Sequence, residues 1–298
     1  MFFTLISSLS IDCPAIINLA LSVKMDIKQP SIMNKINTDC CLSLARTTCV
    51  NERVTVINWS SLTLNGYLNL SLIPSEVVTL DVSFNVLTGS IHNIPSTLKT
   101  FRAIDNSLNG TFTIPSTLNY LEIAENLFTG PLVFLPSQLQ VFLANNNKFT
   151  GNIQSILPPG LTSLQIANNL LNGSIPSLPT TLLVLYLSTN SITGSIPNLP
   201  PNLQTLNCYN MQLTGCLPTL PKSLLYIYLR GNTIQGPVSL FTPFAVSLSN
   251  TLISNFTIQD TSCLVAIYPT RHYSTKSINI PCVQKQINIR ILPLAVKQ

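Results

Sequence analysis

The sequence predicts a solenoid, in which short repeated turns stack into a parallel β-sheet on a concave face, with an irregular or polyproline-like convex side and little helix. Three observations lead to this fold class. A motif recurs nine times with a period near 21 residues, apolar and polar positions alternate within it, and 21 prolines exclude long helices. The chain of 298 residues is long enough for one large domain or two small ones.

The repeats can be aligned on the glycine that ends each block. Successive blocks start 23, 21, 20, 21, 22, 21, 21 and 21 residues apart, and a degraded tenth block follows at 243–255. One repeat cannot bury its own apolar face, so neighbouring turns must stack to form the core. The nine blocks span residues 54–66, 77–89, 98–110, 118–130, 139–151, 161–173, 182–194, 203–215 and 224–236.

Within each block, alternation of the kind seen at Leu185 and Leu187 predicts a half-buried strand. A column of asparagines follows these strands, and their stacked amides are expected to satisfy backbone groups of the turning chain. Leu62 and Met211 interrupt this column. Proline occurs about twice in each outer leg, which favours extended segments there. The column consists of Asn85, Asn106, Asn126, Asn147, Asn169, Asn190 and Asn232.

The blocks share the pattern L-x-x-L-x-L-x-x-N-x-L-x-G, by which residues 54–255 resemble leucine-rich repeat proteins. The G-S-I-P that begins at Gly173 and Gly194 is similar to the plant extracellular class, which includes receptor ectodomains and polygalacturonase-inhibiting proteins. The shorter period and the paired Ile-Pro and Leu-Pro steps also resemble short bacterial effector repeats. The resemblance implies a non-catalytic extracellular module that binds a protein, peptide or glycan on its concave face. The alternatives are an inhibitor of a secreted cell-wall hydrolase and an ectodomain fragment of a receptor-like protein.

An N-terminal cap is predicted at residues 11–53, because the end of a solenoid exposes its core. Its cysteines, Cys13, Cys40, Cys41 and Cys49, allow three pairings. The resemblance to plant extracellular repeat proteins implies the pairs Cys13–Cys40 and Cys41–Cys49. Asp12, followed by Cys13-Pro14, predicts a helix that is N-capped by the Asp12 side chain.

A C-terminal cap and tail are predicted at residues 256–298, stapled by Cys263 and Cys282. Cys208 occupies an inward position, where it is either a small buried apolar residue or the partner of Cys216. A chain with cysteines in this arrangement is expected in an oxidising compartment, secreted or at the cell surface.

Residues 1–10 are expected to be the remnant of a signal peptide, with the gene model truncated and the mature chain beginning near Ile11. Five N-x-S/T sequons are compatible with secretion and glycosylation. They lie at Asn58, Asn69, Asn109, Asn172 and Asn255.

Composition narrows the classes of function. Charged residues make up 8% of the chain and hydrophobic residues 46%, which excludes intrinsic disorder. There is no Lys/Arg-rich run and no apolar stretch of the roughly 18 residues that a spanning helix needs, so neither nucleic acid nor a membrane span is expected. No motif for a catalytic nucleophile, metal or phosphate is present, so we expect no enzyme, cofactor or metal. His92 and His272 are expected at the surface, and Trp59 in the core.

The exposed strand positions are predicted to form two zones on the concave face. The charged zone consists of Asp81, Arg102 and Glu122 on successive strands. Its two carboxylates would lie about 10 Å apart with a cation between them, which keeps both ionised. We therefore favour a structural ion-pair ladder over a polar ligand contact, and both over general acid/base catalysis.

The tyrosine zone lies on three neighbouring predicted strands further along the chain. Tyrosine and arginine are enriched in binding hot spots, so this zone is the predicted site for a ligand or partner. The alternatives are aromatic pairing that only stiffens the sheet, or coverage by the C-terminal cap. The zone consists of Tyr186, Tyr209, Tyr226, Tyr228 and Arg230.

Overall fold

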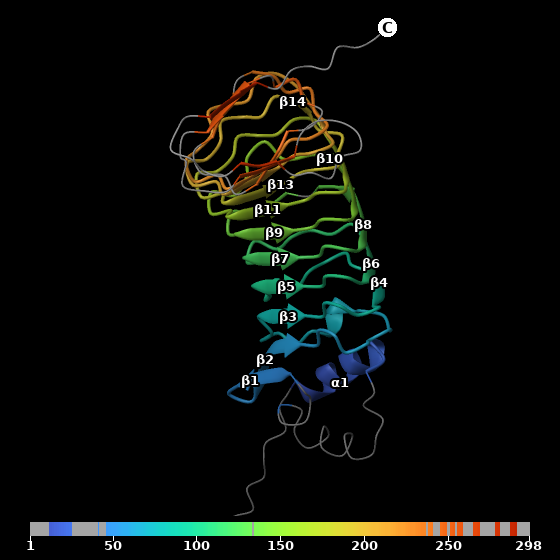
Figure 1. The fold of residues 1–298 in the computed structure, drawn as a ribbon. Helices are drawn as coiled ribbons and strands as arrows, with labels where there is room; N and C mark the ends of the chain where they lie inside the picture. Colours follow the sequence, from blue (N-terminus) through green and yellow to red (C-terminus); the bar gives the residue numbers. More distant parts are fainter. Residues whose placement is uncertain are drawn as a thin grey trace, which may run out of the picture. The chain divides into compact units, whose positions relative to one another are not determined.

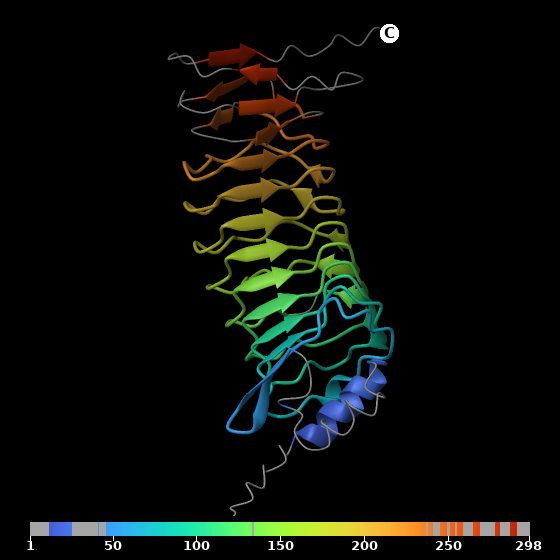
Figure 2. The same cartoon turned by 60° about the horizontal axis from the view of Figure 1, so that its bottom comes forward.

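The computed structural model describes residues 12–25, 41, 46–132, 134–236, 238–240, 245–248, 251–253, 255–258, 265–268, 278–280 and 287–290. The chain divides into two compact units, unit 1 at residues 1–139 and unit 2 at residues 140–298. Each unit is a β-solenoid built from the predicted turn, with its strands lying one above the next (Figures 1 and 2). The fold class predicted from the sequence is confirmed.

The principal sheet of unit 1 starts with an antiparallel hairpin and continues with parallel strands. The hairpin joins β1 (Thr47–Val50) to β2 (Arg53–Asn58). Parallel to β2 follow β3 (Thr79–Asp81), β5 (Thr100–Arg102) and β7 (Tyr120–Glu122). The central residue of each parallel strand points inward, and Leu80, Phe101 and Leu121 are fully buried in register.

The principal sheet of unit 2 repeats the same arrangement. Its parallel strands are β9 (Val141–Leu143), β11 (Ser163–Gln165), β13 (Val184–Tyr186), β15 (Thr205–Asn207), β17 (Tyr226–Tyr228), β19 (Ala245–Ser247) and β21 (Val265–Tyr268). An antiparallel strand, β22 (Ile278–Ile280), pairs with β21. The parallel sheet therefore continues past residue 255, where the predicted repeats end. The boundaries predicted for the N-terminal cap, the repeats and the C-terminal cap remain predictions.

A second set of short strands forms on the outer leg of the turns, which the sequence analysis expected to be irregular. Unit 1 contains β4 (Thr88–Ser90), β6 (Ser107–Gly110) and β8 (Leu127–Pro131). Unit 2 contains β10 (Lys148–Asn152) with β12 (Leu170–Asn172), β14 (Thr193–Gly194) with β16 (Gln212–Leu213), and β18 (Val238–Leu240), β20 (Asn255–Ile258) and β23 (Ile287–Arg290). Alternation of apolar and polar residues in the sequence could have predicted these outer-leg strands. In the structure, buried Leu87 and Ile91 alternate with exposed Val86 and Thr88.

The asparagine column forms the expected ladder. Asn169 Nδ2 donates to the carbonyls of Ala144 at 3.0 Å and Ile166 at 3.1 Å, and its Oδ1 accepts from the amide of Phe149 at 3.0 Å. Each such side chain joins its own turn to the preceding one and leaves no buried amide group unused. The same pattern recurs at Asn85, Asn106, Asn126, Asn190 and Asn232.

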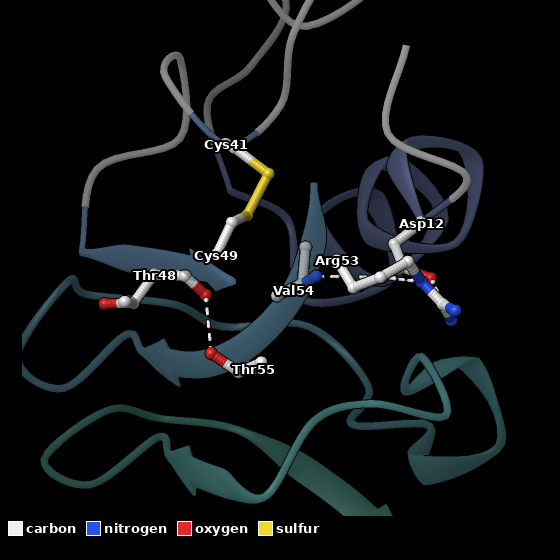
Figure 3. Close-up of a disulfide and its surroundings, with 7 residues drawn as sticks. All are labelled: Asp12, Cys41, Thr48, Cys49, Arg53, Val54 and Thr55. Atoms are coloured by element: carbon white, nitrogen blue, oxygen red, sulfur yellow. Dashed lines mark hydrogen bonds and ion pairs between the residues drawn. A yellow bond between two sulfur atoms is a disulfide. The ribbon is translucent and has the colours of Figure 1, made fainter. Parts of the chain in front are cut away.

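The N-terminal cap contains helix α1 (Cys13–Ser22), which has Pro14 in its first turn. The expectation that the Asp12 side chain caps this helix is wrong. Asp12 is buried and instead accepts two hydrogen bonds from Arg53, both at 3.0 Å, and one from the amide of Val54 at 2.8 Å (Figure 3). The hydrogen bond to Asp12 is the main reason why the pKa of Arg53 is raised. The contact connects the helix to β2. Hydrogen bonds between the Asp12 carboxylate and the Arg53 guanidinium join two charged groups and are stronger than a single bond to a helix amide.

The cysteines of the cap are oxidised where they are described. Cys41 and Cys49 form a disulfide, the pair that the resemblance implies (Figure 3). Cys13 is also disulfide-bonded, whereas Cys40 lies outside the described residues.

The remaining cysteines do not form the pair left open by the sequence. Cys208 is buried and Cys216 exposed, and both are free thiols. Cys263 and Cys282 lie outside the described residues, as do residues 1–11. In the described part of the chain, no helix is both long and apolar enough to cross a membrane.

Candidate binding face

The exposed face of each principal sheet is formed by the outward residues of its strands. In unit 1, Asn58, Asp81, Arg102 and Glu122 follow one another in register along the centre of this face. In unit 2 the corresponding column contains Leu143, Gln165, Tyr186, Asn207 and Tyr228. Parallel neighbours lie about 4.8 Å apart, so consecutive side chains in a column are within contact distance.

The charged zone is a network of mutual hydrogen bonds in unit 1. Arg102 Nε donates to Glu122 Oε2 at 2.7 Å, and Arg102 Nη1 lies 3.9 Å from Asp81 Oδ2. Tyr120 joins the network, since its hydroxyl accepts from Arg102 at 3.3 Å and donates to Glu122 at 3.0 Å. The side chains of Asp81 and Glu122 are only 13% and 11% exposed. These contacts support the interpretation as a structural ion-pair ladder.

The electrostatics of the charged zone agree with this interpretation. The hydrogen bond to Glu122 is the largest cause of the raised pKa of Arg102. Burial is the largest cause of the raised pKa of Tyr120, followed by the charge of Glu122. The Arg102 guanidinium also lies over the Tyr120 ring, 5.1 Å from its centroid.

The tyrosine zone is assembled on three adjacent strands of unit 2. Tyr186 on β13 and Tyr228 on β17 flank Asn207 on β15 in register, and Tyr226 lies on the same face of β17. Tyr209 and Arg230 occupy equivalent positions just after β15 and β17, where the amide of Asn210 donates to the carbonyl of Arg230 at 2.7 Å. Tyr226 is 39% exposed and Arg230 is exposed, while the other three side chains are half-buried.

Asn207 is a residue of this zone that the sequence analysis did not select. Its Oδ1 atom is covered and accepts no hydrogen bond within the described part of the chain. A covered carbonyl oxygen without a donor typically costs about 1–3 kcal/mol. The sequence already placed Asn207 between two tyrosines. Only the packing of the described residues shows that its Oδ1 lacks a hydrogen-bond donor. Ser247 and Tyr268 extend the same column in register on β19 and β21.

The other predicted positions are distributed over the turns. Asn58 lies on the exposed face beside Asp81, and Asn69 is the N-cap of a short 3-10 helix, Leu70–Leu72. Asn109 and Asn172 are exposed on β6 and β12, and Asn255 lies in β20. His92 is exposed, His272 lies outside the described residues, and Trp59 is fully buried as expected. Among the described residues, no group of three or more His, Cys, Asp or Glu side chains could hold a metal ion.

A comparison of the sequence with models of protein families gives a match to one turn of the solenoid. A family model described as Leucine Rich Repeat matches residues 181–203, which include β13. A comparison with curated proteins finds no match.

Comparison with solved structures finds a similar fold in a plant ice-binding protein and weaker matches to two other proteins. A plant ice-binding protein matches with a TM-score of 0.51 and 19% identity, covering 76% of this chain and 88% of that one. The plant peptide hormone receptor RGFR1, in complex with RGF2, matches with a TM-score of 0.47 and 22% identity, covering 70% of this chain and 46% of the receptor. YopM from Yersinia enterocolitica matches with a TM-score of 0.49 and 23% identity, covering 74% of this chain and 55% of YopM. This chain thus spans about half the length of the receptor and of YopM, and at these identities the likeness is one of fold.

Proposed function

We propose that this chain, which folds as a leucine-rich repeat solenoid, is a non-catalytic binding module. Its ligand is a protein, peptide or glycan that contacts the exposed face of the principal sheet of unit 2. The observation that carries the proposal is the tyrosine zone, where four tyrosines and an arginine gather on adjacent turns of one face.

Tyrosine suits this role because it combines a large rigid ring with a hydroxyl that can stay hydrogen-bonded at the edge of a contact. Ordering such a side chain costs little entropy, since only two torsions must be fixed. The strands beneath are held in the parallel ladder and by the asparagine column, so the face is rigid before a ligand arrives. A preorganised surface loses less free energy on binding than a flexible one.

The charged zone is the other polar cluster on the principal sheets, and its geometry favours a structural role. Arg102 is already bound to Glu122, and a ligand would have to displace that contact. Because the Glu122 side chain is only 11% exposed, breaking this contact would leave a largely buried carboxylate without its cation, which disfavours exchange for a ligand.

We place the protein outside the cell, secreted or at the cell surface. The support is the oxidised cap, with its Cys41–Cys49 disulfide and disulfide-bonded Cys13. Sequons at Asn109 in unit 1 and Asn172 in unit 2 are exposed on outer-leg strands, where a glycan can be attached.

The proposal is tested with the full-length protein on a glycan array and in a pull-down from secreted proteins and peptides. Tyr226→Ala/Tyr228→Ala should weaken capture of the ligand at least 30-fold, since each hot-spot tyrosine is worth on the order of 2 kcal/mol. The matched control is Tyr67→Ala, because Tyr67 is 52% exposed and pairs with Thr88, away from the principal face.

If the double variant folds and binds like the wild type, the ligand surface lies elsewhere. Capture of a hydrolase with loss of its activity would identify the inhibitor alternative.

A second candidate function is binding to ice, and it is favoured by a file of uncharged side chains on the outer-leg strands. The residue before each repeat glycine is exposed and is usually threonine, which offers a hydroxyl and a methyl group. Thr88 and Thr193 are held by hydrogen bonds to the carbonyls of Gly66 and Gly173, at 3.3 and 3.1 Å. This threonine file consists of Thr88 and Thr129 in unit 1 and of Thr150, Thr193 and Thr214 in unit 2, and the same position in the other turns is occupied by Asn65, Asn109, Asn172 and Gln235.

Ice presents hydrogen-bond donors and acceptors at regular spacing and no net charge, which an ordered uncharged file can match. The protein should then show thermal hysteresis and inhibit ice recrystallisation. Thr150→Lys/Thr214→Lys should abolish both effects, and Ser163→Lys, on the exposed face of β11, should leave them intact. Equal activity of both variants, or none in the wild type, would remove this candidate.

A further inference from the structure

We propose that the ligand of the tyrosine zone is an anionic polysaccharide, a sugar chain that carries carboxylate or sulfate groups. This inference rests on the binding face proposed above and assigns its ligand class.

The first support is the distribution of charge between the two units. Unit 2 contains eight Lys and Arg residues and a single acid, Asp260, which gives it a formal net charge of +7. Unit 1 contains seven Lys and Arg residues and nine acids, a net charge of −2. The formal charge of the unit that carries the tyrosine zone therefore favours anionic ligands over cationic ones.

The second support is the state of Arg230. Arg53 and Arg102 in unit 1 are bound to Asp12 and Glu122. Arg230 is exposed, and no Asp or Glu occurs in the described part of unit 2, so the unit supplies no carboxylate to it there. A guanidinium in this position can bind a carboxylate or sulfate of a ligand through two parallel hydrogen bonds.

The third support concerns what the face offers besides charge. The main-chain amides and carbonyls of β13, β15 and β17 are engaged with one another, so an extended peptide cannot add to the sheet on this face. Side chains alone remain for recognition, and they are rings and hydroxyls that suit the faces and hydroxyls of sugar units.

Charge density separates a polysaccharide from a nucleic acid. Nucleic-acid sites neutralise many phosphates in a row with closely spaced Lys and Arg. Among the residues of unit 2 whose side chains the structure describes, the cations are Lys148, Lys222 and Arg230, and Arg230 is the cation of the tyrosine zone. A polymer that bears about one charge per sugar fits this sparse pattern better.

The experiment measures binding of the full-length protein to five soluble probes by calorimetry at 50 mM and 500 mM salt. The probes are polygalacturonate, dextran sulfate, neutral dextran and polyglutamate, with single-stranded DNA as a further polyanion. We expect at least one of the two anionic polysaccharides to bind at least tenfold more tightly than neutral dextran, polyglutamate and DNA, with affinity that falls at high salt. A preference between the first two probes distinguishes carboxylate from sulfate.

Paired variants separate the site from general electrostatic attraction. Arg230→Gln should weaken binding of the preferred polysaccharide at least tenfold, whereas Lys148→Gln, the same charge change on β10 of the same unit, should change it less than threefold. Arg230→Lys should restore part of the affinity, and thermal melting must show that all variants are folded.

Each failure has a distinct meaning. Equal or tighter binding of neutral dextran, polyglutamate or DNA, an absence of polysaccharide binding, or no effect of Arg230→Gln overturns the anionic polysaccharide and leaves the proposed face intact. If Tyr226→Ala/Tyr228→Ala also leaves binding of the preferred probe unchanged, the proposed face fails with it.

Discussion

Cys208 and Cys216 show at the residue scale how burial sets chemistry. Cys208 is fully buried in the turn that contains β15, whereas Cys216 is exposed after β16. Burial raises the pKa of Cys208 to about 12, because apolar surroundings disfavour the thiolate. Cys208 therefore behaves as a small apolar core residue, one of the two interpretations that the sequence left open.

The first prediction concerns the reactivity of these thiols. Iodoacetamide at pH 8 should modify Cys216 in the native protein and leave Cys208 unmodified, as read by peptide mass spectrometry. Unfolding in guanidinium chloride should expose both, which serves as the control. Equal labelling of both residues in the native protein would contradict the burial of Cys208.

The second prediction follows from the same pKa. In the unfolded chain a thiol ionises near pH 8.5 to 9, well below the folded value. Above that pH the unfolded chain binds fewer protons than the folded one, so the free energy of unfolding decreases as pH rises. The contribution of Cys208 should shrink by about 1.5–2 kcal/mol between pH 7 and pH 10. Urea unfolding at both pH values should show this loss for the wild type relative to Cys208→Ala, and an unchanged difference would refute it.

At the scale of elements, the asparagine ladder and the Asp12–Arg53 contact hold different parts of the chain together. The ladder joins each turn to the next through one side chain that both donates and accepts. The Asp12–Arg53 contact joins residues 41 positions apart and ties the cap helix to β2. Both place polar atoms in buried positions where every hydrogen bond counts.

The third prediction uses the interruption of the ladder at Met211, which is buried at the asparagine position of its turn. Met211→Asn should restore hydrogen bonds equivalent to those of Asn190, here to the amide of Ile192 and the carbonyl of Leu187. We expect a gain of about 1 kcal/mol, or about 2 °C in Tm. The control Leu213→Asn places the same amide at a fully buried apolar position and should lower Tm. A lower Tm for Met211→Asn would show that this turn is built for an apolar residue.

At the scale of the whole molecule, the repeat architecture makes stability local. Each turn contacts mainly its neighbours, so the effect of one lost contact should fade along the chain. The same architecture places the two candidate binding surfaces on different strands: the principal sheet of unit 2 carries the tyrosine zone, and the outer-leg strands carry the threonine file.

The fourth prediction tests this locality. Asn190→Ala removes hydrogen bonds to Ile166 and Leu187 and one from the amide of Leu171, a loss of about 2–3 kcal/mol. Hydrogen exchange followed by mass spectrometry should show reduced protection at residues 161–215, with little change at residues 77–110. Uniform loss of protection would mean that the chain unfolds as one cooperative unit.

The sequence by itself determined the features that repeat. The period, the inward columns, the asparagine ladder and the order of Asp81, Arg102 and Glu122 along one face could all be read from it. The physical reason is that a solenoid converts a fixed spacing along the chain into a fixed spacing across the sheet, so one turn predicts the next. The positions of the five residues of the tyrosine zone followed in the same way.

Only the tertiary structure decided the contacts between residues that no repeat relates. Local packing decides that Asp12 pairs with Arg53 and that the Oδ1 of Asn207 is covered. It also decides that Cys208 is buried while Cys216 is exposed. The parallel sheet past residue 255 could not be predicted, because the repeat motif there has lost its spacing. The main chain of β21 nevertheless pairs with β19. Hydrogen bonding between strands tolerates such sequence change, since it uses the main chain that every residue shares.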